Sequence, residues 1–267
     1  MPIEHLVFLA IIQGITEFLP ISSSGHLALF PALTGAEDQG LALDVAVHVG
    51  TLGAVMLYFA RDVKSLTIGG MQASVGQFKT DEAQLFLKLL VATIPVIVAG
   101  FLIKIFGFVE QMRNIEVIAW AMIIFGIVLY FADQFCACKR SFDSWSWRDS
   151  IILGLWQALA LIPGTSRSGA TLTGARFLGY ERVDGARIAM LMSIPTIIAA
   201  GGLLGIEVYE SGDLTLGLDM LIAAALAFIS ALLALFGMMR MLERFSMTAF
   251  VVYRVALGIF LLWFVNG

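Results

Sequence analysis

The chain has 267 residues, of which 60% are hydrophobic and only 13% are charged, and its mean hydropathy is +0.93. Soluble domains carry about 25% charged residues, so this composition excludes an ordinary soluble protein and indicates a polytopic membrane protein. The formal net charge is -4 and no basic patch interrupts the chain, which gives no reason to expect a nucleic-acid partner.

Six segments are apolar and long enough to cross about 30 Å of hydrocarbon. In chain order we predict transmembrane helices at 44–60, 85–106, 116–135, 187–207, 217–239 and 248–265. Two further apolar regions, near 3–33 and 150–180, are broken in the middle by Pro, Gly and Ser. Irregular backbone at membrane depth is tolerated only where protein buries it or where it lines a wet cavity. We therefore predict two re-entrant helix–loop–helix hairpins.

Each half of the chain, 1–137 and 145–267, then holds one hairpin and three crossings within a single membrane domain, 1–267. Because three is odd, the second half must be inverted relative to the first, and the hairpin loops are expected to meet near the midplane. The predicted fold is an all-α polytopic membrane protein with an inverted-topology repeat, six transmembrane helices and two re-entrant hairpins.

Two motifs support this duplication. The first reads Q-G-I-T-E-F-L-P-I-S-S-S-G-H from Gln13 to His26, and the second reads Q-A-L-A-L-I-P-G-T-S-R-S-G-A-T from Gln157 to Thr171. One offset of 144 positions pairs Gln13 with Gln157, Ser22 with Ser166, Ser24 with Ser168, Gly25 with Gly169 and Gly35 with Gly179. A second echo, T-I-P-V-I at 93–97 and S-I-P-T-I at 193–197, has an offset of 100 and is read as a further trace of the repeat.

The distribution of Lys and Arg predicts the orientation in the membrane. One side collects Arg61, Lys64, Lys79, Lys139, Arg140, Arg148, Arg176, Arg182, Arg187, Arg240 and Arg244. The opposite side holds Arg113, Lys104 and an acidic loop with Glu207, Glu210 and Asp213. We therefore expect the basic side in the cytoplasm. Both termini and the mouth of the first hairpin then face outward, and the second hairpin enters from the cytoplasm.

The first motif carries a cluster of polar groups in an apolar segment. Glu17 follows Gln13 by four residues, so both lie on one helix face, and a carboxylate at membrane depth usually has a function. The alternative is an interfacial helix with Glu17 in water. Ser22, Ser23, Ser24 and Gly25 follow, and a helix that begins here would present free N–H groups to an anion. Serines also cap helices without any other role.

His26 lies three residues after Ser23, so the two side chains can meet on a helix. Such a pair is the minimal activated nucleophile, although a single histidine in an apolar segment is more often a satisfied core residue.

The second motif places Arg167 inside an apolar hairpin, where an unpaired guanidinium is costly. Its planar fork suits a carboxylate or a phosphate. The neighbouring backbone and hydroxyl groups form a candidate phosphate site: Gly164, Thr165, Ser166, Ser168 and Thr171. The alternative is a structural ion pair between Arg167 and Glu17, and both interpretations can hold.

Three more titratable groups lie in the predicted crossings. Asp44 can begin its helix, where a negative charge suits the dipole, and His48 is expected behind the site rather than in the core. Arg254 is expected to snorkel or to pair with an acidic neighbour.

The two motifs resemble the signatures of a known family. The segment from Gln13 to His26 is similar to the first signature of the undecaprenyl-pyrophosphate phosphatases, bacterial membrane proteins also named for bacitracin resistance, and Pro163–Thr171 is similar to their second signature. The similarity covers essentially the whole chain. It implies hydrolysis of undecaprenyl diphosphate to undecaprenyl phosphate and phosphate in the bacterial inner membrane, which recycles the lipid carrier for wall polymers.

The resemblance also implies roles for individual residues. Ser23 matches the proposed nucleophile, His26 the motif histidine and Arg167 the pyrophosphate-binding arginine. Many relatives have Glu where this chain has Gln13, so a role that needs negative charge there is not implied. In one mechanism His26 takes the proton of Ser23 while Glu17 orients His26 or binds metal; in the other, His26 or Glu17 activates water and Ser23 only binds. The remaining motif residues would bind substrate: Gln13, Ser22, Ser24, Gly25, Gly164, Thr165, Ser166, Ser168 and Thr171.

The family resemblance further implies a divalent cation, Mg or Ca, and a homodimer. A rival function from another class is a transporter or flippase of an anionic lipid, because inverted repeats with broken helices at the midplane are also a transporter design.

Overall fold

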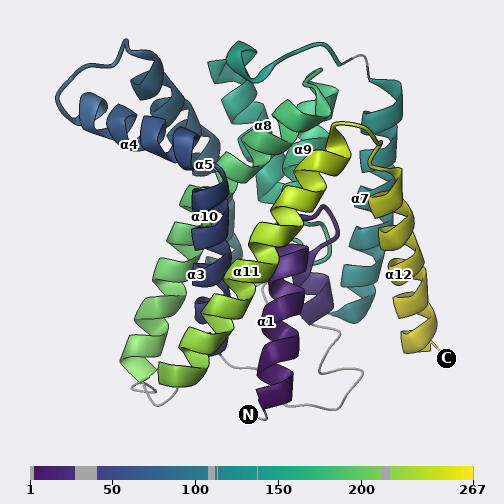
Figure 1. Cartoon of the computed structure of the whole chain (residues 1–267). Helices are drawn as coiled ribbons and strands as arrows, with labels where there is room; N and C mark the ends of the chain where they lie inside the picture. The colour runs from purple at the N-terminus through teal and green to yellow at the C-terminus, as the bar shows by residue number, and fades with distance from the viewer. Residues whose placement is uncertain are drawn as a thin grey trace.

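The computed structural model describes residues 3–27, 41–107, 112, 114–136, 138–211 and 217–266, and most of them are helical (Figure 1). In chain order the helices are α1 (Ile3–Phe18), α3 (Leu41–Tyr58), α4 (Ala60–Ser74), α5 (Asp81–Ile105), α7 (Ile115–Phe135), the 3₁₀ turn η1 (Phe142–Ser144), α8 (Trp147–Leu159), α9 (Arg167–Phe177), α10 (Arg182–Ser211), α11 (Gly217–Leu242) and α12 (Thr248–Asn266). Within the described residues the only β pairing is an isolated bridge between Arg140 and Tyr180.

The six predicted crossings correspond to α3, α5, α7, α10, α11 and α12. Five of these helices are long and apolar enough to cross a membrane alone, and α3 meets the same criteria together with α4. A bend of 94° separates α3 from α4, so α4 turns aside and extends away from the bundle (Figure 1). The protein is a multi-pass, all-α membrane protein.

The two predicted re-entrant hairpins are confirmed over the described residues. α1 ends at Phe18, the chain reverses, and a second helical arm begins at Ser23. In the second hairpin, α8 ends at Leu159 and α9 begins at Arg167. α1 lies in the half of the molecule that holds both termini, whereas α8 and α9 lie in the opposite half (Figure 1). Residues 28–33 of the first hairpin, and Gly35, lie outside the described residues.

The two halves are interdigitated rather than side by side. α1 packs against α11, and α8, its counterpart in the repeat, packs against α5. α3 likewise packs against α11, and α10 against α5. Each hairpin therefore rests on the second crossing of the other half, and this exchange brings the two loops together in the interior.

The interpretation of the proline echo as a trace of the repeat is wrong. Pro95 lies in α5 and Pro195 lies in α10. α5 is the second crossing of its half, whereas α10 is the first crossing of the other half. The two prolines therefore do not occupy equivalent helices.

The second hairpin is anchored at its entry by Asp149. Ser146 and Asp149 form a capping box at the start of α8, and Oδ2 of Asp149 also accepts from Arg140 at 2.6 Å and from the Tyr180 hydroxyl at 2.8 Å. Burial raises the pKa of this carboxyl, but hydrogen bonds from Arg140 and Ser146 outweigh it and lower the pKa to about 2. Asp149 therefore stays charged and ties α8 to the chain on both sides of the hairpin.

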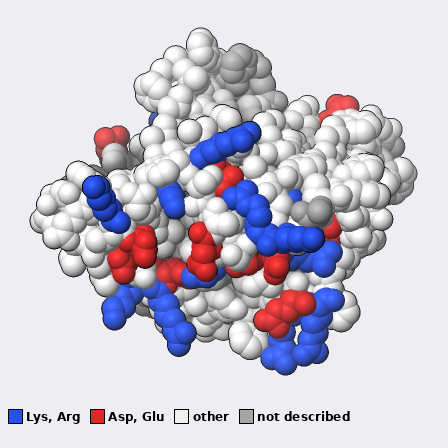
Figure 2. Space-filling model, turned by 90° about the horizontal axis from the view of Figure 1, so that it is seen from above, with Lys and Arg blue, Asp and Glu red and all other residues white. Residues whose placement is uncertain are grey.

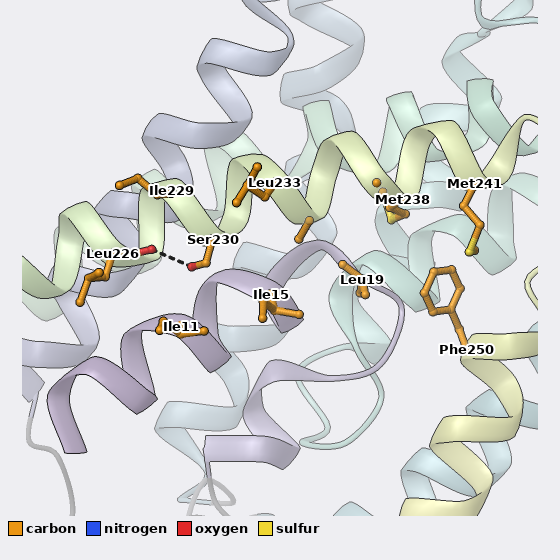
Figure 3. A pocket seen from close by; sticks show the side chains of 12 residues that line it. Ile11, Ile15, Leu19, Leu226, Ile229, Ser230, Leu233, Met238, Met241 and Phe250 are labelled. Atoms are coloured by element: carbon orange, nitrogen blue, oxygen red, sulfur yellow. Dashed lines mark hydrogen bonds between the residues drawn. The ribbon is translucent and has the colours of Figure 1, made fainter. Parts of the chain in front are cut away.

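α11 crosses α1 and α3 at glycines. A Cβ on Gly14 would lie 1.9 Å from Oγ of Ser230, and one on Gly50 would lie 2.2 Å from the carbonyl oxygen of Ala224. Such close approach of helix backbones needs small residues. Beside this contact the surfaces of α1 and α11 form an apolar groove of about 640 Å³, with Ile11 and Ile15 on one wall (Figure 3). Gln13 and Glu17 of α1 are buried on another face of the helix.

We expect Gly50→Val to destabilise the protein by about 1–3 kcal/mol, because the added atoms overlap a backbone carbonyl that cannot rotate aside. Gly237→Val is the matched control, since nothing lies within 4 Å of a Cβ at that position on α11. Thermal unfolding in detergent, followed by tryptophan fluorescence, should show a lower Tm for Gly50→Val only. Equal midpoints for the two variants would contradict this packing of α3 on α11.

Candidate active site

The two hairpin loops share one backbone geometry. Ser22 and Ser166 have φ of 74° and 71°, and they are the only described non-glycine residues with positive φ. Each serine hydroxyl lies close to that of the serine two residues on, 3.2 Å in the first loop and 3.1 Å in the second. Each also accepts the N–H of the following glycine, Gly25 or Gly169. The duplication seen in the sequence is therefore a duplication of structure.

The loops contact each other directly. Oγ of Ser168 donates to the carbonyl of Leu19 at 3.0 Å, and the N–H of Gly164 donates to Oγ of Ser24 at 3.4 Å. Gly164 has a φ of 91°, and a Cβ there would lie 2.3 Å from the carbonyl oxygen of Ile118 in α7. The second loop is thus held between the first loop and α7, and only glycine fits at this point.

Glu17 is the centre of the hydrogen-bond network. One carboxylate oxygen forms the expected ion pair with Arg167 of the other hairpin. The second oxygen accepts from Nε2 of Gln13 at 2.7 Å and from Oγ of Ser23 at 2.9 Å. The Glu17 side chain is only 2% exposed, so the alternative of a carboxylate in water at the membrane surface is wrong. The serine hydroxyl is hydrogen-bonded to a base, and that base is Glu17.

The expected contact between Ser23 and His26 does not form. Nδ1 of His26 lies 2.7 Å from the carbonyl oxygen of Ser22, and Nε2 lies 2.6 Å from the hydroxyl of Tyr253 in α12, whose ring stacks on the imidazole. Because a carbonyl oxygen only accepts, Nδ1 carries the proton and Nε2 accepts from the tyrosine. Both ring nitrogens are engaged, so His26 supports the loop rather than the Ser23 hydroxyl.

His48 contacts Gln13, as expected of a residue that supports the site, but it also lines the cavity directly. Its Nε2 lies 3.3 Å from Nε2 of Gln13, and its Nδ1 lies 2.7 Å from the backbone carbonyl of Asp44. Asp44 therefore contributes its carbonyl, which fixes the protonated nitrogen of His48 and leaves the other nitrogen to accept from Gln13.

A cavity of about 230 Å³ is lined by six of the fifteen predicted site residues. Its lining comprises Glu17, Ser23, Ser24, His48, Val96, Gln157, Ala160, Leu161, Ser166, Arg167, Thr196, Ile197 and Ala200. The polar residues come from both hairpins, α3 and α10, and the apolar ones from α5, α10 and the second loop. Gln13 lies behind Glu17, while Ser22, Gly25, Gly164 and Ser168 shape the loops. Thr165 and Thr171 are buried outside the lining, with hydroxyls that have no partner among the described residues.

The site offers some, but not all, of the oxygen ligands that a hard divalent cation needs. Glu17 offers a carboxylate, Ser23 a hydroxyl, and Oε1 of Gln13 is buried without a partner among the described residues. The described residues contain no group of three His, Cys, Asp or Glu that could hold a metal ion. Mg²⁺ commonly uses one or two carboxylates and takes its other ligands from phosphate and water. Glu17 and Gln13 are therefore the residues that would hold such an ion.

Arg254 was expected to snorkel or to pair with an acid, and neither is the case. It is fully buried, and its guanidinium donates to the carbonyl oxygens of Pro20, Gly164 and Thr165. The sequence prediction failed because backbone carbonyls of distant loops leave no signal near position 254. Tyr253 was missed for the same reason.

Comparison of the sequence with those of known proteins identifies the family. The family model described as "Bacitracin resistance protein BacA" matches residues 6–260. This chain belongs to the BacA family. A relative in Ruegeria sp. (strain TM1040) is 58% identical over 267 residues, and the alignment covers 100% of each chain. Relatives in Ruegeria pomeroyi and Jannaschia sp. (strain CCS1) are 58% and 56% identical over 262 residues, 98% of each chain. All three are named undecaprenyl-diphosphatase. The BacA match includes both hairpins and every residue placed at the cavity.

Proposed function

We propose that this BacA-family protein hydrolyses undecaprenyl diphosphate to undecaprenyl phosphate and inorganic phosphate. This reaction returns the lipid carrier to peptidoglycan and other wall-polymer synthesis and gives resistance to bacitracin. The observation that carries the proposal is the meeting of Arg167 and Glu17, from opposite hairpins, at a cavity where Ser23 is bonded to Glu17. The names of the relatives supply the substrate.

Arg167 is the phosphate clamp in this proposal. Its planar fork matches phosphate oxygens, and it begins α9, whose first N–H groups and dipole also favour an anion. When a phosphate enters the cavity, Arg167 exchanges the Glu17 carboxylate for phosphate oxygens. Glu17 then loses its cationic partner and becomes a stronger base.

Glu17 takes the proton of Ser23, whose Oγ attacks the terminal phosphorus. The bond from that phosphorus to the bridging oxygen breaks, and undecaprenyl phosphate leaves with the proton that Glu17 had taken. Water then attacks the phosphorus of the phosphoseryl group while Glu17 takes a proton from the water. The bond from phosphorus to Oγ breaks, phosphate leaves, and Glu17 returns the proton to Oγ of Ser23. In the variant without a covalent step, Glu17 activates water and Ser23 only holds the phosphate. The alternative role of Glu17 is to hold, with Gln13, a divalent cation that would neutralise charge on the phosphate oxygens. Water rather than Glu17 would then take the proton of Ser23.

The apolar wall of the cavity suits a lipid substrate. Val96, Leu161 and Ile197 lie in the same cavity as the polar groups, so a prenyl chain can remain in an apolar environment while its diphosphate reaches Arg167.

The charge distribution supports a location in the bacterial inner membrane with the basic face in the cytoplasm. Lys and Arg gather with acidic residues on one end of the molecule (Figure 2), and both termini lie at the other (Figure 1). By the positive-inside rule, the termini and the first hairpin then open to the periplasm. We also expect a homodimer, as in the family resemblance.

Arg167→Lys should reduce phosphate release from prenyl diphosphates in detergent by at least about 10²-fold, because an ammonium keeps the charge but cannot make the forked contact. Lysine also preserves a cation for Glu17, whereas Arg167→Ala leaves that carboxylate unpaired. Arg148→Lys, on the exposed start of α8, is the control and should keep full activity. If the unsubstituted protein binds the lipid but releases no phosphate without a membrane gradient, the flippase function replaces the phosphatase.

Ser23→Ala should lower kcat by several powers of ten, against about 10²–10³ for loss of a single stabilising donor. Ser22→Ala and Ser24→Ala are matched controls from the same loop, with hydroxyls bonded to each other rather than to Glu17. kcat is measured for all three at saturating metal, with folding checked by gel filtration. Similar modest losses in the three variants would assign Ser23 to binding and leave water as the attacking group.

The orientation can be tested with single cysteines in a background that lacks Cys136 and Cys138. A cysteine at exposed Glu210 should react with an impermeant thiol reagent added from the periplasmic side, and one at exposed Lys79 should not. The reason is that the two positions lie at opposite ends of the bundle. Labelling of both from the same side would contradict the inverted arrangement.

A further inference from the structure

Arg254 is a buried cation whose partners are all backbone carbonyls. It has 0% exposure in α12, and its donors reach the carbonyl oxygens of Gly164 at 3.0 Å, Thr165 at 2.8 Å and Pro20 at 3.4 Å. No carboxylate in the described part of the chain forms an ion pair with it. A buried arginine without a carboxylate is costly, so these three contacts are what compensates the burial.

The three carbonyls belong to the two site loops. Pro20 lies just before Ser22, and Gly164 and Thr165 lie just before Ser166, so Arg254 contacts each loop beside its strained serine. Positive φ at a non-glycine residue is strained and persists only where the surroundings determine it. A planar guanidinium that bonds both loops is such a determinant.

The contacts also fix peptide planes. No described peptide bond is cis, so a Thr165 carbonyl directed at Arg254 points the N–H of Ser166 the opposite way. Ser166 itself lines the cavity. The guanidinium occupies space that Gly169 leaves free, since a Cβ there would lie 2.9 Å from Nη1 of Arg254. The preceding residue of α12, Tyr253, bonds His26 of the first hairpin.

We propose that Arg254 is a positioning residue for phosphoryl transfer, an inference that rests on the proposed phosphatase activity. It holds the two loops at a fixed separation and fixes the orientation of their peptide groups, so that Ser23 and Arg167 can contact the same phosphate. Its charge has no anionic partner among the described residues, whereas that of Arg167 is paired with Glu17. Arg254 therefore also adds a positive charge behind the two loops, which favours a polyanionic head group.

Arg254→Lys tests this role because it keeps the charge and removes the planar fork. Binding of a non-hydrolysable prenyl methylenediphosphonate to the purified full-length protein gives the number of sites that can bind substrate, here called competent sites. The rate of prenyl diphosphate hydrolysis divided by this number gives kcat per competent site. We expect kcat per site to fall about 10–10²-fold, since a misplacement near 1 Å has that effect, with a much smaller change in KM.

Arg176→Lys is the matched control. Arg176 is also buried, at 5% exposure, and donates to the backbone carbonyls of Tyr180 and Asp133. It also forms an ion pair with the Asp133 carboxylate and does not bond the site loops. It should lower Tm and leave kcat per competent site unchanged. A purely structural Arg254 would behave in the same way, so unchanged kcat per site in Arg254→Lys overturns the proposal.

Gly169→Ala tests the positioning role of Arg254 if the Arg254→Lys variant does not fold. The added methyl would lie 2.9 Å from Nη1 of Arg254 and 3.2 Å from Cβ and Oγ of Ser166, so it disturbs the contact between the guanidinium and this loop without removing the charge. The same loss of kcat with retained analogue binding is expected. Normal kcat in Gly169→Ala overturns the proposal. Failure of the unsubstituted protein to release phosphate would instead overturn the phosphatase function, so the two failures are distinguishable.

Discussion

The ion pair between Glu17 and Arg167 is the interaction on which this architecture depends. Each charge lies on a broken helix within an apolar bundle, and each would be costly there alone. Because the two charges come from opposite hairpins, neither hairpin can satisfy its own. The tips must meet, and the interdigitated packing of α1 on α11 and α8 on α5 makes this possible. The same requirement brings two irregular loops together at a polar cavity, the one environment that tolerates such backbone at membrane depth.

The duplication provides a symmetric frame and an asymmetric site. Ser22 and Ser166 adopt the same positive φ, so the loops are built alike. The chemistry lies where the copies differ: Glu17 stands opposite Leu161 in the alignment, and Ser23 stands opposite Arg167. The local twofold relation therefore brings Ser23 and Arg167, the nucleophile and the phosphate clamp of the proposed reaction, to one cavity. α12 breaks the symmetry further, because Tyr253 and Arg254 contact both loops from one side.

The sequence predicted what is encoded locally and missed what depends on distant backbone. The six crossings, both hairpins and the Glu17–Arg167 pair could be predicted, since long apolar runs, their interruptions and buried charges are visible within short windows. The Ser23–His26 contact was wrong because i,i+3 spacing permits a contact without excluding a better partner, and Tyr253 lies 227 positions away. The proline echo was misread for a related reason: Val96 and Ile197 follow the two prolines and line the same cavity, so the likeness reflects a shared location rather than common descent from one repeat.

The buried ion pair between Glu17 and Arg167 matters more for reactivity than for stability. A buried pair adds little net stability, because desolvation of both partners offsets their attraction. In the proposed mechanism, it provides a conditional reactivity. While Arg167 holds Glu17, the ion pair disfavours transfer of the Ser23 proton to the carboxylate. A phosphate that attracts the guanidinium would release Glu17 as a base when the substrate is present. Part of the attraction between Arg167 and phosphate is thereby used to free Glu17 and does not tighten binding of the substrate in the ground state. Binding interactions raise kcat when they are used in this way. The rigid frame around the loops is needed for this exchange, since a guanidinium can alternate between two partners only if both stay within its reach.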